Sequence, residues 1–201
     1  MLQANALAAE RGGQRLFSDI SFQLDSGSLL HVSGSNGSGK TTLLRMLCGL
    51  TLPAEGSISW QQQNIESNRD AFNEELLFIG HRHGMHSDLN ALENLSLSCK
   101  QNSNNAMIFA ALDEVGLRDH LEKPLRLLSQ GQQRRVALAR LLLESCKLWV
   151  LDEPLAALDV NAVEWFSQHL ARHLESGGMA VVTTHQEASF ISRVNINVVL
   201  G

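Results

Sequence analysis

The chain has 201 residues, of which 44% are hydrophobic and 18% are charged, and its formal net charge is −5. This length and composition indicate one globular domain, alone or with a subdomain, that can bury a core. The acidic balance argues against nucleic acid as the main partner, and three scattered cysteines argue against a disulfide framework. The N-terminus has no signal-peptide pattern and charges interrupt the most apolar stretch, so we expect a cytosolic protein without a membrane span.

Short apolar runs alternate with helix-like segments along the chain. Residues 29–34 (LLHVSG) form an apolar run that ends at glycine, and a segment of helical composition follows. Residues 148–151 (LWVL) are continuously apolar, and residues 179–184 (MAVVTT) are apolar up to two final threonines, which is typical of strands covered on both faces. Strands separated by helical segments predict an α/β fold with a mainly parallel sheet.

The stretch of about residues 90–145 has a different pattern. Its segments AMIFAALDEVGL and QQRRVALARLLLE have helical periodicity, with a polar break at KQNSNN and no convincing strand. We interpret it as a helical subdomain inserted between two parts of the sheet.

A glycine-rich segment, GSNGSGKT, links the first apolar run to the helix that follows it. It fits the G-x-x-x-x-G-K-[ST] pattern, in which backbone N–H groups and a helix N-terminus surround phosphate oxygens. The lysine supplies charge for the β- and γ-phosphates, and the final threonine can ligate Mg²⁺. A glycine-rich surface turn is the alternative. The residues that we expect to bind the nucleotide here are Gly34, Ser35, Asn36, Gly37, Ser38, Gly39, Lys40, Thr41 and Thr42.

The second buried run ends in two carboxylates. Asp152 follows the run directly, at the carboxyl edge of the sheet where open α/β folds bind ligands, so we predict that it holds Mg²⁺ together with Thr41. Glu153 is placed to deprotonate the attacking water. The alternative interpretation of the same pair is a turn that caps a helix, without a catalytic role.

The segment LSQGQQRR places Ser129 and Gly131 at the start of a helix whose apolar positions include Val136, Ala139 and Leu143. Free N–H groups and a serine hydroxyl at such an end can bind an anion, although a plain helix cap has the same residues. Located between the phosphate loop and LWVLDEP, this segment resembles the signature sequence of the ABC-transporter ATPases. The resemblance covers nearly the whole chain, in the expected order of motifs.

The resemblance implies one ABC ATP-binding domain over residues 1–201, an α/β fold with a P-loop NTPase core. That core has a parallel sheet with added antiparallel strands and carries the helical subdomain of about residues 90–145. It also implies ATP and Mg²⁺ as cofactors, a membrane partner and a head-to-tail homodimer. In that dimer the signature of one copy closes over ATP held by the other. The family residues that this implies are Ser129, Gln130, Gly131 and Gln132 in the signature, Asp159 in the D-loop and His185 as the switch histidine.

Three histidines stand in LLFIGHRHGMH, at positions 81, 83 and 86. The family carries a Q-loop glutamine about fourteen residues before the end of an ENL segment, which here places His81 at that position. An imidazole can donate or accept a hydrogen bond as an amide can, so we expect His81 to act in the glutamine's place, with His83 and His86 solvated. A metal or haem site is the alternative, but the chain offers no second tight pair of Cys or His ligands.

Two further groups of residues give expectations. His169 and His173 lie four apart on a predicted helix, where an exposed polar face is a simpler interpretation than a metal site. The family stacks adenine on an aromatic residue before the phosphate loop, but this chain has no tyrosine and Arg11 stands at that position. We expect the Arg11 guanidinium plane to stack on the base, or Phe17 to contribute.

The small size and the string GHRHG, with histidine at the Q-loop position, make the chain similar to the ATP-binding subunits of bacterial cytochrome c maturation systems, the haem-exporter family. This implies a peripheral protein on the cytoplasmic face of the inner membrane, with integral-membrane partners and no direct haem binding. An ABC ATPase for another substrate stays open, as does a soluble ABC ATPase acting on nucleic acid or ribosomes. A non-catalytic nucleotide-binding module is disfavoured because Lys40, Asp152, Glu153 and His185 are all present.

Overall fold

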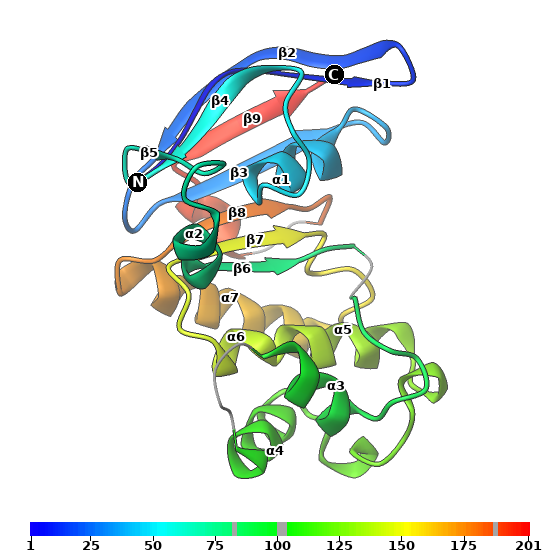
Figure 1. Ribbon diagram of the computed structural model, residues 1–201. Coiled ribbons are helices and arrows are strands. Elements are labelled where there is room, and N and C mark those ends of the chain that lie inside the picture. The colour runs from blue at the N-terminus through cyan, green and yellow to red at the C-terminus, as the bar shows by residue number, and fades with distance from the viewer. Residues whose placement is uncertain (82–83, 100–103, 187–188) are drawn as a thin grey trace.

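The computed structural model describes residues 1–81, 84–99, 104–186 and 189–201. A five-stranded parallel sheet has the order β6-β7-β8-β3-β9, and a four-stranded antiparallel sheet has the order β2-β1-β4-β5 (Figure 1). The strands are β1 (Leu2–Arg11), β2 (Gln14–Leu24), β3 (Leu29–Gly34), β4 (Glu55–Trp60), β5 (Gln63–Asn64), β6 (Leu76–Ile79), β7 (Leu148–Asp152), β8 (Met179–Thr183) and β9 (Ile196–Leu200). The helices are α1 (Lys40–Leu47), α2 (Arg69–Glu75), α3 (Ala91–Ser98), α4 (Asn105–Glu114), η1 (Arg118–His120), η2 (Leu125–Leu127), α5 (Gln130–Leu138), α6 (Arg140–Leu143), α7 (Val160–Glu175) and η3 (Ser189–Arg193).

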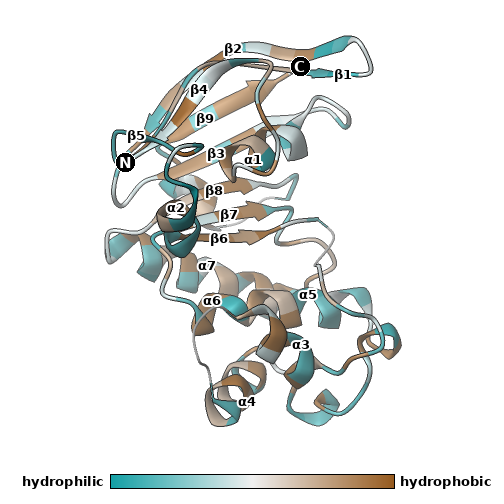
Figure 2. Ribbon diagram, in the orientation of Figure 1, coloured by the Kyte–Doolittle hydropathy of each residue, from teal (hydrophilic) through white to brown (hydrophobic). Residues whose placement is uncertain are grey.

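The parallel sheet is covered on both faces, as the continuous apolar runs predict. Every residue of β7 and β8 is buried, and Figure 2 shows both strands as mainly hydrophobic. Successive side chains of a strand point to opposite faces. Leu148 and Val150 therefore pack in the core under α1, whereas Trp149 and Leu151 pack in the core against α7. The prediction of an α/β fold with a parallel sheet and added antiparallel strands is confirmed.

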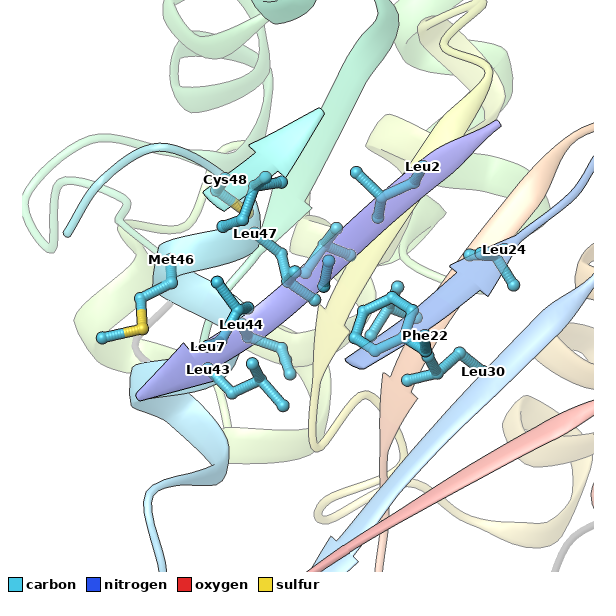
Figure 3. Packing of buried hydrophobic residues seen from close by; sticks show 14 of the residues in the cluster. Leu2, Leu7, Phe22, Leu24, Leu30, Leu43, Leu44, Met46, Leu47 and Cys48 are labelled. Carbon is cyan, nitrogen blue, oxygen red and sulfur yellow. The ribbon is translucent and has the colours of Figure 1, made fainter. Parts of the chain in front are cut away.

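Helix α1 lies between the two sheets (Figure 1). Its fully buried residues Leu43, Leu44 and Leu47 share one core cluster with Leu2 and Leu7 of β1, as Figure 3 shows. Burying an aliphatic side chain stabilises the fold by roughly 1.5–3 kcal/mol. This packing fixes the position of α1, and with it the glycine-rich loop at its N-terminus.

The described residues between β6 and β7 form helices, with one isolated bridge between Asn90 and Pro124. The parallel sheet lies between these helices and the antiparallel sheet (Figure 1). The helices have a core cluster of their own, which includes Leu95, Ile108 and Val136. The boundaries of a subdomain at about residues 90 and 145, within a single domain of residues 1–201, stay a prediction.

The expectation of an exposed polar face at His169 and His173 is wrong. The His169 side chain is 13% exposed, and its Nε2 lies 3.0 Å from Glu114 Oε1. The His173 ring stacks on Trp149 with centroids 3.7 Å apart, and burial lowers the pKa of this histidine. The two rings have separate protein partners, since His173 packs on Trp149 of β7 and His169 contacts Glu114 of α4.

Candidate nucleotide site

The glycine-rich loop connects β3 to α1 and places Lys40 at the first residue of the helix. Lys40 Nζ donates hydrogen bonds to the carbonyl oxygens of Gly34, at 2.8 Å, and Ser35, at 3.0 Å. The ammonium group therefore lies inside the loop, beside the free N–H groups and the positive dipole end of α1. This arrangement is suited to phosphate groups.

Glycine is required at two positions of this loop. A Cβ atom on Gly34, where φ is +145°, would lie 2.1 Å from the carbonyl oxygen of Leu200. Gly39 has φ of +101°, and a Cβ there would lie 3.0 Å from the ring of Phe17. The loop is thus pressed against β9 on one side and β2 on the other, which holds its shape. Within it Ser35, Asn36 and Gly37 are exposed, whereas Ser38 Oγ is buried.

Asp152 ends β7 with a carboxylate that two threonines orient. It is 2% exposed, and it accepts hydrogen bonds from Thr41 Oγ1 at 2.7 Å and Thr183 Oγ1 at 2.8 Å. A hydroxyl and a carboxylate held this close form a set of hard oxygen donors of the kind that Mg²⁺ prefers. The residues present therefore fit a magnesium ion at Thr41 and Asp152.

Glu153 directly follows Asp152 and has a left-handed backbone, with φ of 51°. Such a conformation is strained for a residue other than glycine, by roughly 1–3 kcal/mol. The turn breaks the alternation of the strand, and consecutive carboxylates line one cavity instead of opposite faces. The Glu153 N–H donates to Thr183 Oγ1 at 2.8 Å, and Glu153 Oε1 lies 3.5 Å from His185 Nε2.

These groups surround a cavity of about 540 Å³. The sequence-predicted residues that line it are Arg11, Asn36, Gly37, Gly39, Lys40, Thr41, Thr42, His81, Asp152, Glu153 and His185. Leu16 and Ala156 complete the lining. Groups suited to phosphate, the Thr41–Asp152 pair that fits Mg²⁺, and the Glu153–His185 pair thus meet in one place, from elements far apart in the sequence.

Arg11 at the end of β1 and Leu16 of β2 line the same cavity. Arg11 is exposed, and the described residues offer it no ion pair. Phe17 is 8% exposed and belongs to the core cluster under the loop. The Phe17 ring lies close to Gly39, and the expectation that Arg11 or Phe17 contributes to holding the base stays a prediction.

The three histidines of residues 81–86 do not share one environment. His81 lines the nucleotide cavity and also a neighbouring cavity of about 590 Å³. His86 is exposed, and its N–H donates to Asn94 Oδ1 at 2.8 Å. His83 lies outside the described residues. Over the described ranges, no group of three or more His, Cys, Asp or Glu side chains is arranged to hold a metal ion.

The comparisons with known proteins agree on one family. The sequence profile described as "ABC transporter" matches residues 17–156. Two curated relatives, from Escherichia coli (strain K12) and Shigella flexneri, are each 47% identical to the chain over 186 residues. The match covers 92% of this chain and 89% of each relative, and both are named "Cytochrome c biogenesis ATP-binding export protein CcmA". The chain belongs to the ABC transporter family.

Solved structures of ABC cassettes share the fold. The dimeric structure of MJ0796, a bacterial ABC transporter cassette, has a TM-score of 0.84 at 22% identity and covers 100% of this chain and 94% of its own. A post-hydrolysis structure of the same cassette, bound to ADP and Pi, has a TM-score of 0.80 at 23% identity, with 92% and 88% covered. The resemblance predicted from the motifs is confirmed, and the protein is an ABC-type ATPase.

The ABC signature residues lie away from the phosphate loop of their own chain. Ser129 caps α5 by accepting the Gln132 N–H at 3.2 Å, while Gln132 Oε1 accepts the Ser129 N–H at 2.9 Å. A Cβ on Gly131 would lie 2.4 Å from the carbonyl oxygen of Ala157, so the signature packs tightly on the segment after Glu153. Ser129, Gln130, Gly131 and Gln132 are absent from the lining of the nucleotide cavity.

Asp159 likewise lies outside that cavity in the described structure. It caps α7 by accepting the Ala162 N–H at 2.9 Å, and it pairs with Arg135 of the signature helix. The Asp159 carboxylate thus connects α5 to α7 within one chain. In this isolated chain it does not contact the phosphate loop.

Thr183 is a site residue that the sequence analysis missed. The register of the parallel sheet sets it beside Asp152, and its hydroxyl contacts both the Asp152 carboxylate and the Glu153 N–H. A polar residue at the end of a buried apolar strand was the available signal. Without the strand order, however, the sequence did not show which neighbour that hydroxyl would meet.

Proposed function

We propose that this protein is the ATP-hydrolysing subunit of a membrane ABC complex for cytochrome c biogenesis, acting in haem export or in the release of haem from its chaperone. The observation that carries the hydrolytic part is the cavity in which Lys40, the Thr41–Asp152 pair and the Glu153–His185 pair meet. Bound Mg²⁺ would neutralise charge that develops on the transferred phosphoryl group.

Each group has a distinct task in this proposal. Lys40 and the loop N–H groups bind the β- and γ-phosphates, and Glu153 accepts a proton from the attacking water. His185, at 3.5 Å from the Glu153 carboxylate, holds that carboxylate in place and contacts the γ-phosphate. Thr183 fixes both acids, because a single hydroxyl contacts Asp152 and the Glu153 backbone.

The location of the signature supports a head-to-tail homodimer. Residues 129–132 form the N-terminus of α5, where the positive end of the helix dipole lies, and they are outside their own chain's nucleotide cavity. A second copy could bring such an end against the γ-phosphate. We propose that residues 129–132 of each copy, with Asp159, close over ATP bound by the phosphate loop of the other.

The biological setting rests on the relatives. Proteins that are 47% identical over 92% of the chain carry the name of a cytochrome c biogenesis export protein. In the part of the chain that the structure describes, no helix combines the length and the apolar character needed to cross a bilayer. We propose a peripheral subunit at the cytoplasmic face of the bacterial inner membrane. Integral-membrane subunits are its partners, and neither nucleic acid nor directly bound haem is a ligand.

A complementation experiment tests this setting. The chain is expressed in Escherichia coli that lacks its 47% identical relative, and covalent haem in c-type cytochromes is measured by haem staining. We expect the wild-type chain to restore c-type cytochromes and Lys40→Ala to fail at equal expression. Wild-type chain that hydrolyses ATP but does not restore them would favour the alternative, an ABC transporter subunit for another substrate.

We expect His81→Gln to retain most ATPase activity and cytochrome c maturation. An amide can replace the imidazole as a hydrogen-bond donor or acceptor at the cavity wall. His81→Ala should lower turnover by about tenfold while the affinity for ATP changes little, which is the pattern of a group that acts after binding. Steady-state kinetics and nucleotide titration measure the two effects.

His86→Ala is the matched control, because His86 is exposed and contacts Asn94 through its backbone only. A metal site would give a different result. All three histidine substitutions would then cause similar damage, and metal analysis would find stoichiometric zinc or iron that chelation removes.

Arg11→Ala is expected to weaken ATP binding by roughly two- to fivefold, the effect of losing one exposed stacking contact between a cation and a ring. Arg11→Lys keeps the charge but loses the plane, so it should resemble Arg11→Ala. Titration with ATP measures both variants. ATP affinity unchanged in Arg11→Ala would show that the base does not rest on this guanidinium.

A further inference from the structure

Arg134, on the signature helix α5, is a buried cation that the proposed chemistry does not use. Its residue exposure is 2%. Burial lowers the pKa of its guanidinium, while the negative charges of Asp152 and Glu153 raise it. In the described part of the chain it forms no ion pair, and its Nε atom has no hydrogen-bond partner. A buried charge without a paired acid is costly, so stability alone gives little reason for arginine here.

The guanidinium instead contacts two successive backbone carbonyls. Nη1 donates to the oxygen of Gly80 at 3.2 Å, and Nη2 to the oxygen of His81 at 3.4 Å. These carbonyls directly follow β6, at the point where the chain leaves the parallel sheet. The planar fork of arginine can reach both oxygens, whereas the single ammonium of lysine lacks that geometry.

The two ends of this link are both part of the proposed site. One turn before Arg134 on the same helix are the signature residues at the N-terminus of α5. At the other end is His81, which lines the nucleotide cavity and the neighbouring cavity that Arg134 also lines. Between them the connection is short and buried, so a shift of α5 would be passed to the backbone of His81.

We infer that Arg134 is a positioning residue that holds His81 in register with the signature helix, so that the two respond together when the nucleotide site closes. This inference rests on the proposed ATPase function, in which His81 contributes to turnover. Arg134 does not touch the nucleotide in this assignment. Its effect is carried by the backbone of Gly80 and His81.

The experiment measures kcat and KM for MgATP with the full chain carrying Arg134→Lys or Arg134→Gln, in wild-type and His81→Ala backgrounds. Arg118→Gln is the matched control, because Arg118 is exposed on η1 and contacts Asp113 and the Phe109 ring away from the nucleotide cavity. Thermal melting of each variant checks that it folds. If Arg134→Gln does not fold, Arg134→Lys decides the result.

We expect both substitutions to lower kcat by about tenfold and to leave KM within about twofold, since misplacing a group slows the reaction more than it weakens binding. In the His81→Ala background the same substitutions should change kcat by less than about twofold, because their effect passes through His81. Equal losses in both backgrounds, an unchanged kcat, or a change confined to KM would overturn the inference. A different result would contradict the proposed function: a wild-type chain that does not hydrolyse ATP, or whose ATPase activity is unchanged by Glu153→Gln.

Discussion

Glu153→Gln is expected to slow ATP hydrolysis by at least about 100-fold while ATP still binds. The substitution removes the general base but keeps the size and shape of the side chain. Glutamine can keep the strained turn and the backbone hydrogen bond to Thr183. It can also keep an oxygen near His185, at the position where the carboxylate lies 3.5 Å away. Single-turnover hydrolysis and nucleotide titration with the full chain measure the two properties.

Lys40→Ala is the contrasting variant. It removes the ammonium that lies inside the loop beside the carbonyls of Gly34 and Ser35, so ATP affinity itself should fall. The Glu153→Gln chain should also accumulate a nucleotide-dependent dimer in sedimentation, whereas Lys40→Ala should not. Hydrolysis by Glu153→Gln at the wild-type rate would show that another group is the base.

Gln130→Glu is expected to abolish most ATPase activity without destabilising its own chain. Gln130 is exposed in the first turn of α5, where a negative charge interacts favourably with the helix dipole. In the proposed dimer the same charge faces the γ-phosphate of the other copy, a repulsion of about 1–4 kcal/mol at 4 Å. Gln63→Glu, on exposed β5, adds the same charge away from the site and should be neutral. Gly131 is less suitable, because any side chain there meets the Ala157 carbonyl of its own chain.

Mixing this variant with Lys40→Ala tests the arrangement in trans. Each mixed dimer keeps one site that pairs an intact phosphate loop with an intact signature, so an equal mixture should regain about a quarter of wild-type activity. The measurement is ATPase activity across the mixing ratio, at constant total protein. A mixture no more active than its two inactive components would refute the shared site.

Some features of this protein could be predicted from the sequence alone, because they depend on local motifs. The phosphate loop, the Asp152–Glu153 pair and the helix cap at Ser129 each depend on a few consecutive residues. The pattern of those residues indicates the local backbone structure. The two buried strands were equally accessible, because a run of apolar residues fills the cores on both faces of a parallel sheet. These features predicted the fold class, the family and most of the residues that line the candidate nucleotide cavity.

The tertiary structure decided which side chains from distant elements meet. Strand order places Thr183 beside Asp152, and the packing of β2 under the loop buries Phe17 in the core. Helix α7 packs on β7 and places His173 against Trp149, although the four-residue spacing of His169 and His173 was compatible with a solvent-exposed helix face. Arg134 reaches the end of β6 in the same way, across more than fifty residues of chain. Such contacts depend on the relative placement of whole elements, which is set by core packing and not by the residues next to each position in the sequence.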